Sequence, residues 1–130
     1  MHIATKKSLL KKWIGQYINK FKEKNVSQEE IKKYEYLLTA IDFSLSKDSI
    51  KKVNHLFDIR NKIKTHIINN HFNKEYKKLN EKLNWNMNKL INQIYLIDIK
   101  TEENGQLYRI AVLNKEDLDL FQNKKVYEND

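Results

Sequence analysis

Apolar side chains recur every three or four positions through the first two thirds of the chain, and this spacing is typical of amphipathic helices. The first stripe predicts a helix from about Thr5 to Lys24. Its apolar positions are Leu10, Trp13, Ile14, Tyr17, Ile18 and Phe21. Lysines fill most of the remaining positions, so this helix is expected to have one apolar side and one basic side.

Two further helices are predicted by their start signals as well as by their stripes. Ser27 and Glu30 form a capping box, in which the serine accepts from a backbone N–H and the glutamate reaches back. The helix that follows is expected to end near residue 43. A third helix is expected to begin after Ser46 or Asp48 and to end at about Asn69, because asparagine tolerates the left-handed conformation that closes a helix.

Beyond residue 93 the pattern changes from helix to strand. Two apolar runs, 94–100 and 106–113, flank Asn104-Gly105, and an Asn-Gly pair between such runs is a strong hairpin signal. Asn114 is then placed as the N-cap of a short last helix. The sequence therefore predicts a mainly α (α+β) fold with four to five helices, a C-terminal β-hairpin and a short last helix.

The stretch LNEKLNWNMNKLINQI, residues 79–94, allows two interpretations. It is either one continuous surface helix or two short helices joined by a turn at Asn84-Trp85-Asn86. The turn is favoured because Trp85 would lie outside the apolar stripe of a continuous helix, and because asparagine suits turns and caps better than helix interiors. We therefore expect a break at this point and a second helix over about residues 87–96.

With that break, the order of short helix, turn, second helix and hairpin resembles the winged helix-turn-helix family of DNA-binding domains. The resemblance covers about residues 50–121. It rests on Leu79 and Leu83 before the turn, on Leu90 and Ile94 after it, and on the hairpin as the wing. It implies that the second helix lies in the major groove of double-stranded DNA and that the wing contacts the backbone or the minor groove.

The resemblance also implies which residues contact DNA. Asparagine and glutamine make bidentate contacts with adenine, so sites that contain A·T pairs are the expected targets, whereas Lys89 is expected on phosphate or guanine. The contacts expected from the second helix are Asn86, Asn88, Lys89, Asn92 and Gln93. Those expected from the wing are Lys100, Thr101, Asn104, Gln106 and Arg109.

The charge of the chain agrees with a polyanionic partner. The formal net charge is +8, from 25 basic and 17 acidic residues, and this balance favours nucleic acid or an anionic membrane surface. It disfavours an acidic mimic of DNA. Twenty-three of the basic residues are lysine, and the abundance of Lys, Asn and Ile is typical of an A·T-rich genome, so codon usage is a second explanation for part of the charge.

No thiolate, metal or cofactor chemistry is expected. The chain has no cysteine, its four histidines lack the spacing of a metal site, and no glycine-rich phosphate loop is present. No apolar run approaches the roughly 18 residues that span a bilayer. No signal peptide is recognisable either, so a cytoplasmic protein without a cofactor or a membrane partner is expected.

The chain divides into residues 1–45, a winged-helix-like region, 46–121, and a flexible tail, 122–130, within one structural unit. Two amphipathic helices ahead of a DNA-reading region favour a homodimer, since winged-helix proteins usually bind inverted repeats as twofold dimers. The first helix also suits a membrane surface, but packing in the core or in a dimer is preferred. The expected role is a small prokaryotic, plasmid or phage regulator, or a partition or replication adaptor.

Two other functions remain open. The apolar helices suit a protein–protein module or an inhibitor of a nucleic-acid enzyme. Arg60-Asn61 followed by His66 is similar to the Arg-Asn…His signature of HEPN ribonucleases, in which arginine and histidine act on an RNA phosphate. Six positions separate the two side chains and place them on different faces of a helix, so an arginine paired with Asp58 or Asp42 is the preferred explanation.

Overall fold

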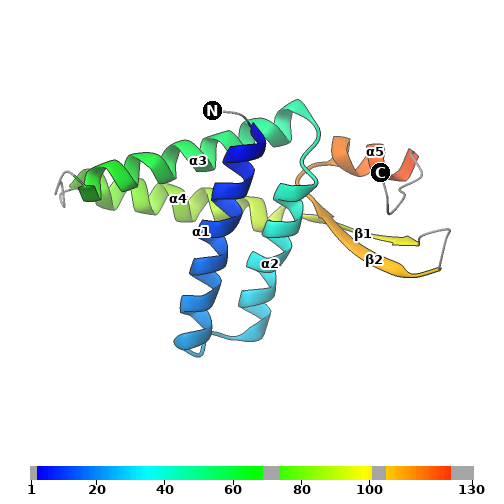
Figure 1. Ribbon diagram of the computed structural model, residues 1–130, viewed down its shortest axis with the longest axis horizontal. Coiled ribbons are helices and arrows are strands. Elements are labelled where there is room, and N and C mark those ends of the chain that lie inside the picture. Colours follow the sequence, from blue (N-terminus) through cyan, green and yellow to red (C-terminus); the bar gives the residue numbers. More distant parts are fainter. Residues whose placement is uncertain (1–2, 69–73, 101–104, 124–130) are drawn as a thin grey trace.

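The computed structural model describes residues 3–68, 74–100 and 105–123. Two helical hairpins cross each other, and a β-hairpin with a short helix beside it projects from one end (Figure 1). The elements are α1 (Ile3–Glu23), α2 (Gln28–Asp42), α3 (Lys47–Ile68), α4 (Lys74–Asn92), β1 (Tyr95–Lys100), β2 (Leu107–Val112) and α5 (Lys115–Asn123). The predicted fold class, mainly helical with a C-terminal hairpin and a short last helix, is confirmed.

The α1–α2 hairpin turns at residues whose local chemistry stops one helix and starts the next. Asn25 has a φ of 58°, the left-handed conformation that asparagine tolerates better than most residues. The Val26 N–H donates to the Phe21 carbonyl at 3.1 Å, which is the longer-range bond of a Schellman motif. Ser27 then caps α2, because its hydroxyl accepts from the Glu30 N–H at 3.4 Å. The predicted Ser27 cap is confirmed.

The apolar faces of the four long helices meet in one core that also receives the base of the β-hairpin. Its fully buried members include Leu10 and Ile14 of α1, Leu37 and Ile41 of α2, Val53 and Leu56 of α3, Met87 of α4, and Ala111 and Leu113. The apolar stripe of α1 is therefore used within the chain. A dimer would have to form through other surfaces.

The N-termini of α3 and α5 meet in a buried polar network. Asp117 is fully buried, and its carboxylate accepts from the backbone N–H groups of Leu45 (3.2 Å) and Ser46 (2.7 Å) and from the Ser49 hydroxyl. Asn114 caps α5 by accepting from the Asp117 N–H at 2.9 Å, which confirms the predicted cap. Its Nδ2 atom donates to the Ser49 hydroxyl at 2.8 Å. These bonds fix α5 to the start of α3, where a negative charge is favoured.

The predicted β-hairpin is present. β1 and β2 pair antiparallel, with Lys100 opposite Leu107, and Gly105 has a φ of 67°, a conformation that a glycine adopts without strain. Asn104, the other residue of the predicted turn, lies outside the described residues. The half of β2 that includes Ile110 is buried, whereas the outer half of the hairpin extends away from the helices (Figure 1).

Candidate nucleic-acid interface

α4 is one continuous helix, so the predicted break at residues 84–86 is wrong. Helical conformation runs without interruption from Lys74 to Asn92, and Tyr95 already belongs to β1. The segment 87–96 is therefore not a separate recognition helix. The turn on which the winged-helix resemblance depended is absent, because α4 continues through it. α3 and α4 lie side by side as a helical hairpin (Figure 1).

A stripe of buried side chains and one hydrogen bond run across the predicted break in α4. Leu83, Met87 and Leu90 are all buried and follow one another at helical spacing, so the apolar stripe passes through the asparagine-rich segment. Asn86, which was expected to cap a second helix, instead donates from Nδ2 to the Lys82 carbonyl one turn earlier, at 2.9 Å. The helix therefore satisfies this asparagine internally.

The residues predicted to contact DNA from this helix lie in two neighbouring stripes at and just after the C-terminal end of α4, where Asn86 is half-buried and the others are exposed. The angular step of 100° per residue separates the two sets. The outer stripe consists of Trp85, Asn88 and Asn92, which are exposed, and the inner stripe of Asn86, Lys89 and Gln93, which lie nearer α3. The structure therefore brings the predicted helix residues together without the predicted turn.

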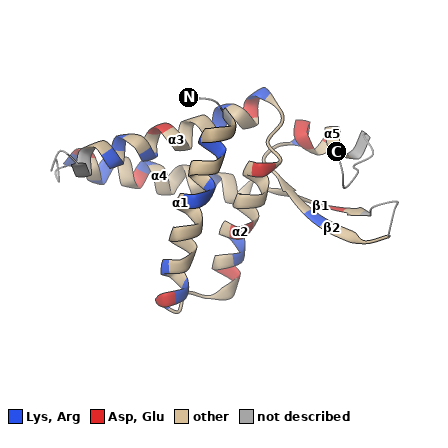
Figure 2. Cartoon of the chain, in the orientation of Figure 1, with Lys and Arg blue, Asp and Glu red and all other residues tan. Residues whose placement is uncertain are grey.

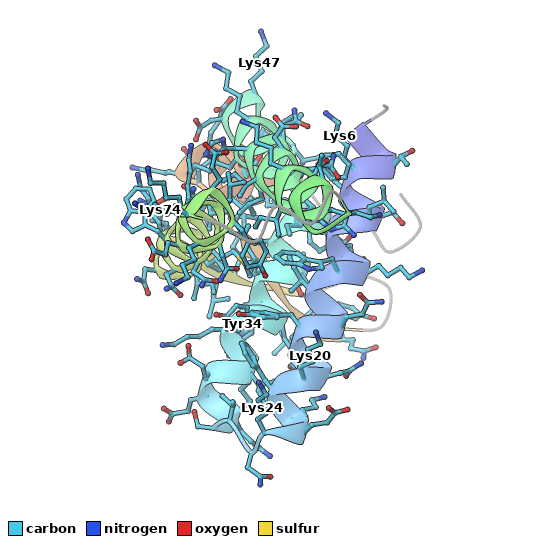
Figure 3. All side chains as sticks on the ribbon, turned by 90° about the vertical axis from the view of Figure 1, so that its left-hand side faces the viewer. Lys6, Lys20, Lys24, Tyr34, Lys47 and Lys74 are labelled. Atoms are coloured by element: carbon cyan, nitrogen blue, oxygen red, sulfur yellow. The ribbon has the colours of Figure 1, made fainter. Side chains whose placement is uncertain are left out.

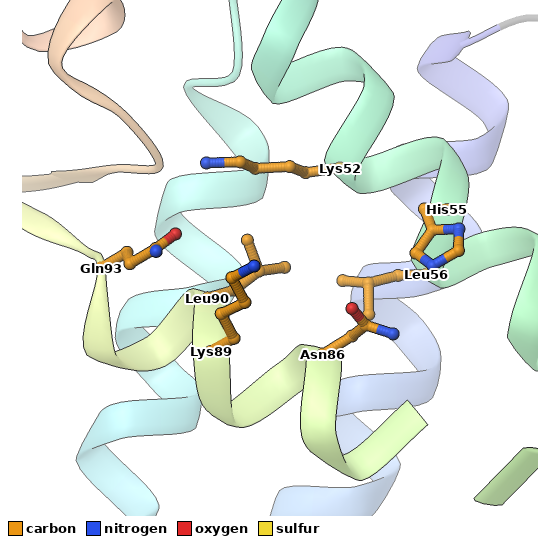
Figure 4. A pocket seen from close by; sticks show the side chains of 7 residues that line it. All are labelled: Lys52, His55, Leu56, Asn86, Lys89, Leu90 and Gln93. Atoms are coloured by element: carbon orange, nitrogen blue, oxygen red, sulfur yellow. The ribbon is translucent and has the colours of Figure 1, made fainter. Parts of the chain in front are cut away.

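A groove of about 100 Å³ lies between α3 and α4 (Figure 4), and we call it the α3–α4 groove. It is lined by Lys52, His55 and Leu56 of α3 and by Asn86, Lys89, Leu90 and Gln93 at the end of α4. None of these residues is acidic. The Lys52 ammonium is held nearby by the Leu113 carbonyl and the Asp48 carboxylate, each at 3.4 Å. Cationic and amide donors in a groove without acidic lining suit an anion such as a phosphate.

Trp85 does not line this groove but contacts Lys89, which does, and most of the tryptophan lies in solvent. Its side chain is 61% exposed. The Lys89 Nζ atom lies 5.0 Å from the centroid of the indole ring, which is a cation–π distance. The sequence singled out Trp85 because it lies off the apolar stripe. The helix nevertheless continues through it, since an exposed side chain does not interrupt packing on the opposite face.

Some of the residues predicted to contact DNA from the tip of the β-hairpin lie outside the part of the chain that the structure describes. Thr101 and Asn104 lie outside the described residues, as does the side chain of Lys100. Gln106 is exposed, and its Oε1 atom accepts from the Tyr108 hydroxyl at 3.2 Å. A role of this tip in binding stays a prediction.

Arg109, the remaining predicted wing residue, takes part in a cross-strand ion pair. Its Nε atom donates to Oδ1 of Asp98 at 3.0 Å. The hydrogen bond to Asp98, with a further one to Tyr36, holds the pKa of the guanidinium above its ordinary value. Because a guanidinium has five N–H donors, this pairing still leaves donors for a phosphate.

Lysines of α1 serve the fold itself. Lys7 donates to the Ser44 carbonyl at the end of α2 (2.7 Å), and Lys11 pairs with Asp42 (2.7 Å). Both contacts place a positive charge at the C-terminal end of α2, where the helix dipole favours it. The high lysine content of the N-terminal segment is therefore partly structural.

The α3–α4 hairpin carries a larger excess of positive charge than the helices of the α1–α2 hairpin do. α3 has six basic and two acidic residues, and α4 has five basic and two acidic residues. Basic positions recur along both helices (Figure 2), and Lys47 and Lys74 extend away from the body of the molecule (Figure 3). Since the whole chain carries +8, this hairpin holds most of the net charge.

The arrangement of Arg60 and His66 gives no support to a ribonuclease site within one chain. Both residues belong to α3, where six positions place them on different faces. The side chain of His66 lies outside the described part. Asp42, one of the two expected partners of Arg60, pairs with Lys11 instead. The HEPN-like function stays an untested prediction.

Among the described residues, no group of three or more His, Cys, Asp or Glu is placed to hold a metal ion. No described helix combines the length and the apolarity that crossing a bilayer requires. No protein-family model matches the chain, and no curated protein or solved structure matches it either. A proposal about function therefore depends on the features of this chain alone. They are an α-rich fold with a basic helical hairpin, an exposed tryptophan and the α3–α4 groove.

Proposed function

We propose that the chain binds nucleic acid, and double-stranded DNA in particular, through the solvent-facing side of α4. The observation that carries the proposal is the charge of the α3–α4 hairpin, where eleven basic residues stand against four acidic ones. A surface of this sign attracts a phosphate backbone and releases its counterions, which supplies most of the affinity of non-specific DNA binding.

Contacts to base edges would come from the C-terminal half of α4. Asn88 and Asn92 lie one turn apart on the exposed stripe, and asparagine pairs with adenine through two hydrogen bonds. The major groove of B-DNA admits a single α-helix, so a continuous α4 suits this role as well as a short one does. The β-hairpin begins three residues after α4 ends and stands beside this end of the helix (Figure 1).

Two finer expectations belong to the same proposal. A cytoplasmic location would bring the chain to DNA in a prokaryotic cell, as a regulator or a partition or replication adaptor. A homodimer would present two copies of α4 to an inverted repeat. Because the α1 stripe is buried, the dimer would use exposed apolar residues such as Leu96 and Leu107 of the β-hairpin.

A protein–protein module is the second candidate, and the β-hairpin is the feature that favours it. Leu96 and Leu107 are 47% and 67% exposed on one face of the hairpin, with the Asp98–Arg109 ion pair between them. Tyr95 and Tyr108 are exposed on the other face. Large apolar side chains that remain exposed on both faces of a two-stranded sheet suit a protein partner that covers them. A stoichiometric protein partner that remains bound after nuclease treatment, and is lost in Leu107→Asp, would favour this function over DNA binding.

The DNA proposal is tested by titrating A·T-rich and G·C-rich duplexes at about 50 to 200 mM salt. We expect the affinity to fall steeply as salt rises, because phosphate contacts dominate it. We also expect Lys89→Ala combined with Asn92→Ala to abolish the preference for the A·T-rich duplex. The matched control, Asn19→Ala with Lys22→Ala, removes the same two residue types from exposed positions of α1 and should leave the preference unchanged.

The opposite result is equally clear. Equal affinity for every polyanion, unaffected by the α4 substitutions, would show a diffuse electrostatic attraction and would end the proposal.

A further inference from the structure

Trp85 occupies the centre of the exposed face of α4. The buried residues Leu83 and Met87 lie two positions before and after it, on the opposite side of the helix. An indole in water gains little from the hydrophobic effect, so this side chain contributes little to the fold. The part of its ring surface that the Lys89 ammonium does not cover is therefore available to a ligand.

The α3–α4 groove provides donors for an anion and shares one residue, Lys89, with the surroundings of this indole. Lys89 links the two features, since its side chain lines the groove and its ammonium lies 5.0 Å from the indole centroid. Lys52 from α3 and Gln93 after α4 line the same groove (Figure 4). A phosphate in the groove and an aromatic ring on Trp85 would thus both adjoin the Lys89 ammonium.

We infer that Trp85 and the α3–α4 groove together bind one unpaired nucleotide of a nucleic-acid strand. The phosphate lies in the groove against Lys89 and Lys52, and the base stacks on the indole. The inference rests on the proposed nucleic-acid binding and adds to the duplex contacts of α4 a site that only an unpaired nucleotide fills. Stacking requires an accessible base face, which an unpaired strand offers and a base-paired duplex keeps inside its own stack.

The experiment uses the fact that the chain has two tryptophans, Trp13 and Trp85. Trp13→Phe leaves Trp85 as the single indole, so fluorescence then reports on Trp85 alone. The probes are an oligothymidylate of about 12 nucleotides, the blunt duplex that it forms with oligoadenylate, and thymidine monophosphate. We expect the single strand to quench Trp85 and to bind about tenfold more tightly than the duplex, because stacking adds to the phosphate contacts.

Substitutions separate the two halves of the site. Trp85→Ala should weaken single-strand binding about tenfold and leave duplex binding within about twofold, and Trp85→Phe should lose less because a ring remains. Lys89→Gln should weaken binding while the strand still quenches Trp85. All three changes lie at exposed positions, so the folded state is expected to persist, and circular dichroism checks this.

Each outcome decides a different question. If neither the strand nor the duplex binds, the proposed function itself fails. If the duplex binds but the strand shows no preference and leaves Trp85 fluorescence unchanged, this inference alone is overturned. Thymidine monophosphate that binds as tightly as the strand would overturn the assignment to a strand, whereas much weaker binding by the mononucleotide supports it.

Discussion

The two helical hairpins have a similar build, but they use the same residue types differently. In the α1–α2 hairpin, Trp13 stacks with Tyr17, their ring centroids 6.0 Å apart, and packs against the core. In the α3–α4 hairpin, Trp85 faces solvent beside Lys89. The comparison teaches that composition alone does not distinguish a structural aromatic from an available one. The contacts of each ring do.

The same contrast holds for charge. The lysines of α1 lie beside α2, which has two basic residues against four acidic ones, and Lys11 pairs with Asp42. α3 and α4 are both positive, so they repel each other at low salt and depend on apolar packing to stay together. A hairpin that retains unneutralised charge at some cost to its own stability is the better candidate for binding a polyanion.

The largest effect on stability is expected where α5 fastens the start of α3. Asp117→Ala leaves the N–H groups of Leu45 and Ser46 and the Ser49 hydroxyl without their buried acceptor. We expect a loss of about 3 kcal/mol in the free energy of unfolding, measured by urea denaturation. Asp119→Ala, on the exposed side of the same helix, is the control and should change stability by less than about 0.5 kcal/mol. Equal losses in both variants would contradict the role of the network.

The two tryptophans provide the next test. Trp13→Ala should lower the free energy of unfolding by about 2 kcal/mol, because a half-buried indole leaves the core surface and its stack with Tyr17. Trp85→Ala should change it by less than about 0.5 kcal/mol, since its ring is mostly in solvent. Thermal or urea denaturation of both variants measures the difference. A large loss from Trp85→Ala would make this residue structural and would remove the contrast between the hairpins.

Lysine pairs then test whether the charge of the two hairpins differs in function. Lys78→Ala with Lys82→Ala on α4 and Lys12→Ala with Lys20→Ala on α1 each remove two exposed positive charges. The α4 pair should weaken duplex binding about tenfold and reduce the salt slope by about 2. The α1 pair should leave affinity within about twofold, because distant charges are screened. Similar losses from both pairs would mean that net charge, and not a particular surface, drives binding.

Local signals in the sequence were sufficient for the boundaries of the helices other than α4 and for the hairpin. Ser27 and Asn114 act as caps where they were expected, and Gly105 has the positive φ of a turn residue. Each of these signals depends on residues within one turn of chain. The fold class follows from them because the apolar stripes between the caps have an unambiguous helical period.

The continuity of α4 was missed because a weak local preference was given more weight than burial. The three asparagines at positions 84, 86 and 88 cost at most about 0.7 kcal/mol each relative to alanine. Burying Met87 and Leu90 contributes roughly 1.5 to 3 kcal/mol each, and both are buried. The packing term is larger, so the helix continues.

The α3–α4 groove was beyond sequence reasoning for a different reason. Lys52 and His55 meet Lys89 and Gln93 only because α3 and α4 pack side by side, more than thirty residues apart in the chain. The contact between Asp117 and Ser46 is equally non-local. No periodicity within a single helix reports which residues of a second helix will lie opposite.

The smallest effect is expected from the aromatic cluster of the α1–α2 hairpin at high pH. Burial, and then the neighbouring Tyr17 and Glu30, raise the pKa of Tyr34 above its ordinary value of 10.0. In the unfolded chain this hydroxyl loses its proton near the ordinary value, while in the folded chain it keeps the proton to higher pH. The stability that depends on this difference is therefore complete below pH 10 and is lost as the pH rises through the folded pKa. We expect the free energy of unfolding to fall less steeply above pH 10 in Tyr34→Phe than in the wild type, in urea titrations at pH 7 and above pH 10. Parallel declines in the two proteins would mean that Tyr34 ionises equally in the folded and unfolded chains, and would contradict the raised pKa.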